Sequence, residues 1–92
     1  MAKSNVRQQA DVAATLQARQ NTHGDYALTA EIIQQLKQDM RVGNWDSLTV
    51  VQKESLEMIA HKIGRILSGN PDHADHWHDI AGYATLAEKQ LG

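Results

Sequence analysis

Hydrophobic side chains recur at helical spacing in four segments of this chain, and no segment shows the strict alternation of a half-buried strand. The clearest segment runs to about position 68 from a start that Ser47 or Thr49 can cap. Its apolar stripe consists of Leu56, Ile59, Ala60, Ile63, Ile66 and Leu67. We therefore predict an all-α fold of about four helices.

The other three helices are expected at about residues 4–19, 27–40 and 71–90. The first of them has only a thin apolar stripe, which consists of Val6, Ala10, Ala13 and Leu16. A stripe this thin buries little surface, so we expect residues 1–20 to serve as an arm for oligomerisation or partner contact. The chain as a whole, residues 1–92, is expected to form a single helical domain.

The stretch Gly69-Asn70-Pro71 is the strongest break in the helical pattern. Gly69 suits a helix C-terminus, Asn70 an N-cap and Pro71 the first helical position, so the last helix should begin almost at once. A connection this short predicts a tight antiparallel hairpin of the last two helices, in which Gly64 and Gly82 let the backbones approach closely. The apolar side of the last helix is expected to consist of Trp77, Ile80, Ala81, Ala84 and Leu91.

Composition and charge narrow the class of protein. The 92 residues include 9 Lys and Arg against 11 Asp and Glu, a net charge of −2 with all five His neutral, and no Cys. The lack of Cys excludes disulfide scaffolds, cysteine-bound zinc and thiol catalysis, and the acidic balance argues against binding to a nucleic-acid duplex. No apolar run approaches the roughly 18 residues that span a bilayer. We expect a cytoplasmic protein without membrane contact, and because so short a chain buries a modest core, we expect a homo-oligomer.

Four carboxylates could meet across the predicted hairpin. Glu54 and Glu57 are spaced i, i+3 on one helix, and Asp75 and Asp79 are spaced i, i+4 on the next. Mg²⁺ takes oxygen ligands and bridges to phosphate oxygens, so this pattern is compatible with a magnesium site. Solvated helix surfaces are also rich in Asp and Glu, and that interpretation stays open.

Histidine and basic residues gather near the same hairpin. A cluster at the start of the last helix, with one member on the preceding helix, comprises His73, His76, His78 and His61. Two His at i, i+3 are a weak zinc signal without a third ligand, and a polar helix start is the alternative. Lys62 and Arg65 are also spaced i, i+3 and could bind a phosphate together. A salt bridge from Arg65 to Asp75 is the favoured alternative.

The loop Thr22-His23-Gly24-Asp25-Tyr26 precedes the second helix. Backbone N–H groups of such a loop can bind an anion, and His23 and Tyr26 could stack on or hydrogen-bond to a base. An ordinary capped turn explains the loop equally well. A Ser/His/Asp triad is set aside, because no strand-to-helix elbow marks a nucleophile.

Three pieces of the chain resemble a group of small, uncharacterised proteins of tailed phages and prophages. They are Thr22–Tyr26, Glu54–Asn70 and His76–Tyr83, and the most specific part is Asp79-Ile-Ala-Gly-Tyr83. The resemblance covers about residues 19–88.

That group is in turn distantly similar to all-α nucleoside triphosphate pyrophosphatases of the MazG type, whose paired carboxylates hold Mg²⁺ against a triphosphate. Glu54-x-x-Glu57 fits the first half of their motif, and His76-x-x-Asp79 stands where Glu-x-x-Asp is expected. The His at position 76 weakens a magnesium site and is compatible with binding without hydrolysis.

These observations and the resemblance lead to one hypothesis with two alternatives. We expect a phage-encoded protein that binds a nucleotide or cyclic nucleotide and sequesters a signal of bacterial anti-phage defence without turnover. The ligand-binding residues are expected to be Thr22, His23, Asp25, Tyr26, His61, Lys62, Arg65, His76, Asp79 and Tyr83. Mg²⁺ is the one candidate cofactor, with Glu54, Glu57 and Asp79 as its ligands. The alternatives are a Mg²⁺-dependent MazG-like pyrophosphohydrolase and an interaction protein that inhibits a host factor.

Overall fold

The structure is a computed structural model that describes residues 12–18 and 25–92. The elements from residue 25 onward are α2 (Tyr26–Met40), the 3-10 helix η1 (Trp45–Ser47), α3 (Val50–Ser68) and α4 (Ala74–Lys89). Residues 12–18 are helical as well, and the described ranges contain no strand. The predicted all-α class is therefore confirmed. Most of the predicted arm at residues 1–20 lies outside the described residues.

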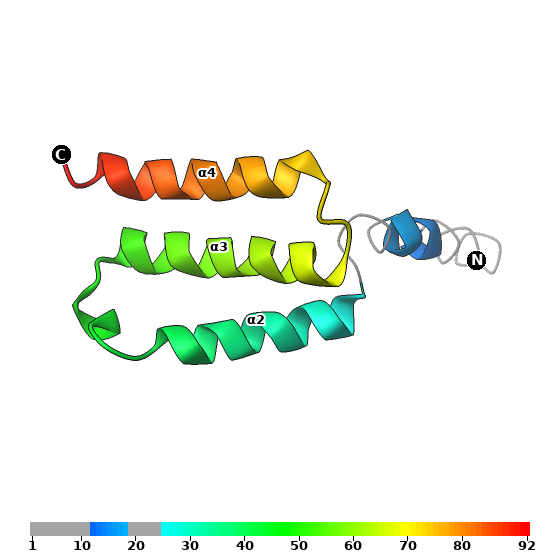
Figure 1. Ribbon diagram of the computed structural model, residues 1–92, viewed down its shortest axis with the longest axis horizontal. Helices are drawn as coiled ribbons and strands as arrows, with labels where there is room; N and C mark the ends of the chain where they lie inside the picture. The colour runs from blue at the N-terminus through cyan, green and yellow to red at the C-terminus, as the bar shows by residue number, and fades with distance from the viewer. Residues whose placement is uncertain (1–11, 19–24) are drawn as a thin grey trace, which may run out of the picture.

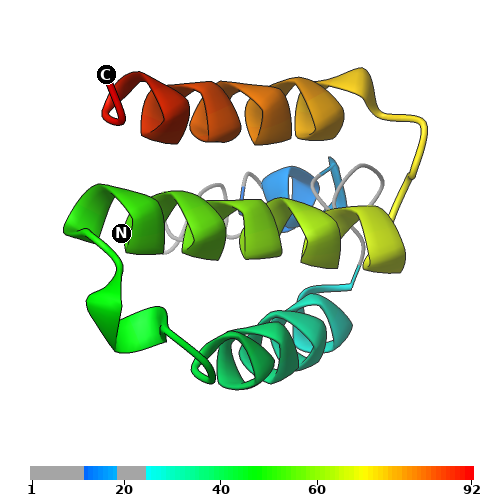
Figure 2. The same cartoon turned by 60° about the vertical axis from the view of Figure 1, so that its left-hand side comes forward.

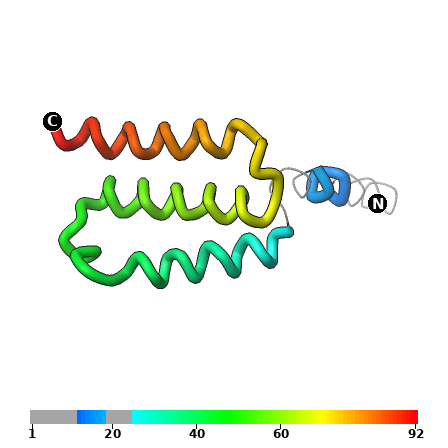
Figure 3. Tube along the Cα trace, viewed as in Figure 1, coloured from blue at the N-terminus to red at the C-terminus, as the bar shows by residue number. Residues whose placement is uncertain are grey.

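Helices α2, α3 and α4 lie side by side in one layer with α3 in the middle (Figure 1). The same order is kept when the molecule is turned (Figure 2). The chain reverses direction between successive helices, so each neighbouring pair is antiparallel (Figure 3). Helix α3 packs against both α2 and α4. The hairpin predicted for the last two helices is confirmed, and α2 and α3 form a second one.

Two of the helix starts follow from local capping. Asp25 is the N-cap residue of α2, and its side chain accepts a hydrogen bond of 3.3 Å from the N–H of Ala27. Thr49 caps α3 by accepting from the N–H of Gln52 at 3.1 Å, and the Gln52 side chain accepts from the N–H of Thr49 at 2.9 Å. Of the two expected cap residues of α3, the structure uses Thr49 and not Ser47.

The start predicted for the last helix at Pro71 is wrong. The N-cap position of α4 is occupied by His73, and the helix itself follows it. Asn70 accepts a hydrogen bond of 2.9 Å from the N–H of Asp72, and Trp77 donates one of 2.7 Å to the carbonyl of Pro71. Asn70 therefore closes a local turn ahead of the helix, because its side chain bonds within the connection.

The seam between α2 and α3 is close-packed. A Cβ atom on Gly64 would lie 2.6 Å from Cγ1 of Ile33, so a side chain there would collide with α2. The hydroxyl oxygens of Thr29 and Ser68 lie 2.5 Å apart across the same seam. Gly64 thus permits a close approach as predicted, but to α2 and not to α4. A Cβ atom on Gly82 would meet no neighbouring atom within 4 Å, so this glycine promotes no approach.

The seam between α3 and α4 is lined with polar groups. His76 is 2 % exposed and is the one residue of α4 that is buried, and Lys62 and Ser55 on α3 are buried too. The expected apolar side of the last helix is wrong in its orientation, because Trp77 is 55 % exposed and Ile80 is only half-buried. The turn of α4 that faces α3 is centred on His76, and Trp77 lies about 100° around the helix from it.

Candidate anion-binding site

Cationic side chains of α2 and α3 converge along one side of the seam between these helices. Arg41 donates from Nη2 to Oε1 of Glu57 at 3.2 Å, and this pair shows the register of the two helices. Lys37 lies one turn before Arg41, and His61 lies one turn after Glu57. Because the helices are antiparallel, this register places Lys37 beside His61.

The pKa of His61 also reflects the cations that surround it. Burial lowers the pKa of His61 from its ordinary value, and the neighbouring charges of Lys37 and Arg65 lower that pKa further. Glu57 acts in the opposite direction as a smaller influence. We call the group formed by Lys37, His61 and Arg65 the cationic cluster.

Two members of the cationic cluster, Lys37 and Arg65, form no ion pair with a described carboxylate. Glu57 is already paired with Arg41, and no other carboxylate pairs with Lys37 or Arg65 among the described residues. The salt bridge expected between Arg65 and Asp75 is wrong. The Asp75 carboxylate is paired with His73 instead, with Oδ2 of Asp75 3.6 Å from Nε2 of His73. An anion placed between Lys37 and Arg65 would therefore meet two cations that no described side chain neutralises.

Lys62 and Asp79, both predicted to bind ligand, bind one another across the α3–α4 seam. Nζ of Lys62 lies 2.8 Å from Oδ2 of Asp79. The hydrogen bond from Lys62 lowers the pKa of Asp79, as do the charges of Lys62, His78 and His76. Lys62 is buried along its length while the Asp79 side chain is 41 % exposed. This pair positions α4 in the described structure.

The predicted histidine cluster is partly assembled. The rings of His73 and His76 meet edge to face with centroids 4.8 Å apart. His76 is buried within the seam, which gives a ligand no access to it in this arrangement. Tyr83, also predicted to bind ligand, is half-buried on α4.

The carboxylates predicted to hold Mg²⁺ do not fit a metal site in this arrangement. Glu57 is bonded to Arg41, Asp79 is bonded to Lys62, and Glu54 is exposed. No three His, Asp or Glu side chains in residues 12–18 and 25–92 come together in a way that could hold a metal ion. Magnesium binding stays a prediction that would require both ion pairs to rearrange.

Of the predicted loop-site residues, Asp25 and Tyr26 lie within the described ranges. Thr22 and His23 lie outside the described residues. Asp25 caps α2 through its side chain, as the capped-turn interpretation predicts. Tyr26 is the first residue of α2 and is 84 % exposed. Its ring is therefore accessible, and its contact with a base stays a prediction.

Sequence reasoning missed Lys37 and Arg41. Arg41 fits the polar side of the second helix, and Lys37 belongs to no motif along the chain. A signal was present, because residues equidistant from the connection between two antiparallel helices lie side by side. Applied to the second and third helices, this rule would have placed Lys37 near His61.

The described residues thus define a small all-helical protein with a cationic seam on a chain of net negative charge. No helix in the described ranges is both long and apolar enough to cross a membrane. The chain belongs to a family known as a domain of unknown function (DUF6378), whose model matches residues 6–91. Searches of curated proteins and of solved structures found no match.

Proposed function

We propose that the protein binds a phosphate-bearing nucleotide at the cationic cluster and holds it without chemical turnover. The observation that carries this proposal is the convergence of Lys37, His61 and Arg65, in which burial first and then the two cations lower the pKa of His61. Mutual repulsion of cations raises the free energy of the unliganded site, and a bound phosphate relieves it. The net charge of −2 on the chain favours a small anion over a long polyanion.

Each member of the cluster suits a different part of phosphate recognition. Arg65 carries a planar guanidinium that can donate two parallel hydrogen bonds to phosphate oxygens. Lys37 contributes a compact charge from the facing helix. Neutral His61 donates from one ring N–H, and protonation gives it a second N–H and a full positive charge.

The experiment is a nucleotide fate assay. Purified protein is mixed with nucleoside triphosphates, cyclic di- and trinucleotides and ADP-ribose derivatives, with and without Mg²⁺. Free ligand is then quantified by chromatography before and after heat denaturation. A ligand that disappears and returns intact supports sequestration. A ligand that is converted to monophosphate and pyrophosphate refutes it in favour of the hydrolase, and ligands that all stay free refute both.

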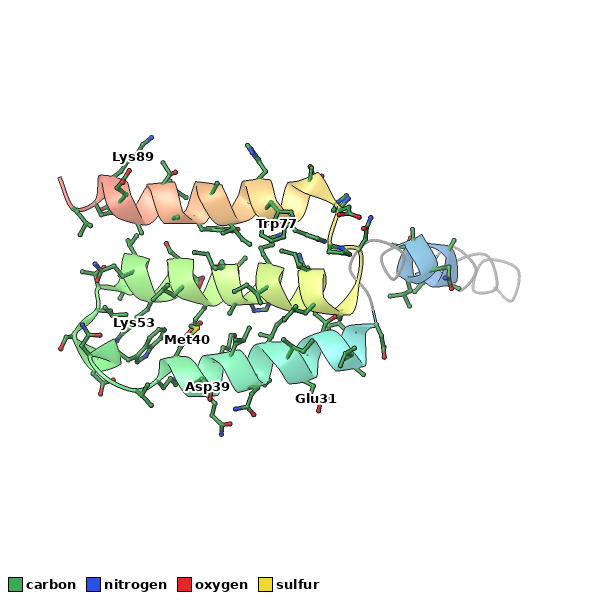
Figure 4. The ribbon with its side chains drawn as sticks, viewed as in Figure 1. Glu31, Asp39, Met40, Lys53, Trp77 and Lys89 are labelled. Atoms are coloured by element: carbon green, nitrogen blue, oxygen red, sulfur yellow. The ribbon has the colours of Figure 1, made fainter. Side chains whose placement is uncertain are left out.

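Charge-removing variants localise the site. Arg65→Gln and Lys37→Gln should each weaken binding by about 10- to 100-fold, the range for a charge-assisted hydrogen bond. Lys89→Gln is the matched control, because Lys89 lies at the far end of α4 and points away from α3 (Figure 4). Equal weakening in all three variants would show a general charge effect and contradict the site.

Binding should also depend on pH with a defined sign. A bound phosphate stabilises protonated His61, so it raises the lowered pKa of that residue. Affinity should therefore rise as pH falls from about 8 toward 6. His61→Gln should remove that rise, and an unchanged profile in the variant would exclude His61.

The biological setting is part of the same proposal. The phage origin, the similarity to MazG-type enzymes and the role against nucleotide-based defence rest on the resemblance of the three sequence pieces. Pyrophosphate release with Mg²⁺ and inhibition of a host factor stay alternative predictions.

A further inference from the structure

The layer of three helices has two unlike faces, and the division is clearest on α3. His61 and Arg65 lie on the side that carries the cationic cluster. At about 100° per residue, Leu56, Ile63 and Leu67 lie about 120–160° around the helix from His61 and about 160–180° from Arg65. Leu67 is 65 % exposed, and Leu56 is exposed as well. One face of the central helix is therefore charged, and the other is apolar and uncovered.

Helix α2 repeats this division. Lys37 and Arg41 lie on the charged side, as the electrostatic influence of Lys37 on His61 and the ion pair of Arg41 with Glu57 indicate. At about 100–180° around α2 from these two residues, three apolar residues follow one another at i, i+4. They are Leu28, Ile32 and Leu36.

Helix α4 also has a charged side and an apolar side, in the same orientation as those of α2 and α3. Asp79 reaches Lys62 on the charged side of the seam. Trp77 and Ala84 are two turns apart, share one side of α4 and are both exposed. They lie about 140–160° around the helix from Asp79. All three helices thus direct apolar side chains to one side of the layer. We call this side the apolar face and define it by Leu28, Ile32, Leu56, Leu67, Trp77 and Ala84.

We propose that the apolar face binds the same face of a second copy of this chain, so that two three-helix layers form a two-layer bundle. Helical domains are normally stable only when two layers enclose a core. The buried hydrophobic residues in the described structure are only Ile33, Trp45 and Ala60. So small a core is marginal for a chain of this length, and pairing two apolar faces would enlarge it.

The dimensions of the face fit this occupant. Neighbouring helices pack about 8–10 Å apart, so three of them span about 25 Å, and a helix of 16 residues such as α4 is about 24 Å long. The face therefore covers on the order of 600 Å² per copy, and two copies reach about 1,200 Å², the lower bound for a stable interface. A single helix is about 10 Å wide and would cover less than half of this width.

This pairing has a consequence for the site. A symmetric pair that buries the apolar faces leaves both charged faces outward. The two cationic clusters would then open to solvent on opposite sides of the dimer. Ligand binding and dimerisation are therefore separable, and each can fail without the other.

The test is sedimentation equilibrium of the full chain over a wide concentration range. Wild type should behave as two copies of the 10.2 kDa chain. Leu67→Glu should convert it to a monomer where wild type is dimeric, because the symmetric contact would bury two new charges. Ala84→Glu is the second variant, since an exposed helix position accepts Glu without loss of the monomer fold.

Leu86→Glu is the matched control. Leu86 is 55 % exposed like its counterparts, but it lies two turns from Asp79 on the charged side of α4. It should leave the dimer intact, and circular dichroism should show equal helix content in all variants. A monomeric wild type overturns the proposal. So does a dimer that resists both Leu67→Glu and Ala84→Glu, or one that Leu86→Glu disrupts equally.

Discussion

The two seams that α3 forms with its neighbours differ in what holds them together. Across the α2–α3 seam, Gly64 brings the helices so close that Ile33 fills the space where a Cβ would lie. Across the α3–α4 seam, the buried groups are polar, with His76 near the start of α4 and Lys62 bonded to Asp79. Shape complementarity governs the first seam, and electrostatics governs the second.

This difference predicts unequal responses to change. The close contact between Gly64 and Ile33 is sensitive to changes of side-chain volume and insensitive to pH, because neither residue carries a titratable side chain. A polar seam tolerates changes of volume better and responds to the protonation of its groups. Helix α4 should therefore be the first of the three helices to detach.

The largest effect is expected from Gly64→Ala. Its Cβ would lie 2.6 Å from Cγ1 of Ile33 and 3.3 Å from the carbonyl oxygen of Thr29. Overpacking of this kind should lower the free energy of unfolding by about 1–3 kcal/mol. Urea denaturation measures it, and a variant as stable as wild type would show that the seam is not close-packed.

A smaller effect of opposite sign is expected from Gly82→Ala. No atom lies within 4 Å of the new Cβ, so the substitution meets open space on α4. Alanine should raise the free energy of unfolding by about 0.5–1 kcal/mol, because it forms helix more readily than glycine. The same urea titration compares the two variants directly. Destabilisation by both would remove the contrast between the seams.

The smallest effect is expected from the ion pair of Lys62 with Asp79, since the Asp79 carboxylate is partly exposed to water. A double-mutant cycle of Lys62→Met and Asp79→Asn should give a positive coupling at neutral pH. The lowered pKa of Asp79 means that this stability is present above the ordinary carboxyl pKa and is lost as pH falls through the lowered value. Coupling that persists unchanged at strongly acidic pH would contradict this origin.

Much of the fold could be predicted because it is local. The periodicity between positions 49 and 68 predicts α3, and Asp25 and Thr49 mark helix starts through bonds to residues two or three positions away. The wrong prediction of a helix start at Pro71 also concerns interactions between residues only a few positions apart. Asn70 can cap either a helix or a turn, and its neighbours determine which.

The candidate site was harder to predict, because its members come from different helices. Arg65 and His61 were identified on α3, whereas Lys37 was missed because it joins them only through the register of α2. The metal ligands were predicted from spacing alone, yet Glu57 and Asp79 each have a cationic partner that is distant in the chain. Spacing along one helix does not reveal such partners.

The amino-acid sequence by itself determined the helical class, most helix ends and the antiparallel hairpin, because these depend on side chains within a turn or two of each other. The tertiary structure alone decided that Gly64 contacts α2, that His76 faces the core and that Trp77 lies exposed. The rotation of a helix about its own axis depends on the sum of its contacts with neighbours. That sum is not encoded in the periodicity of any single segment.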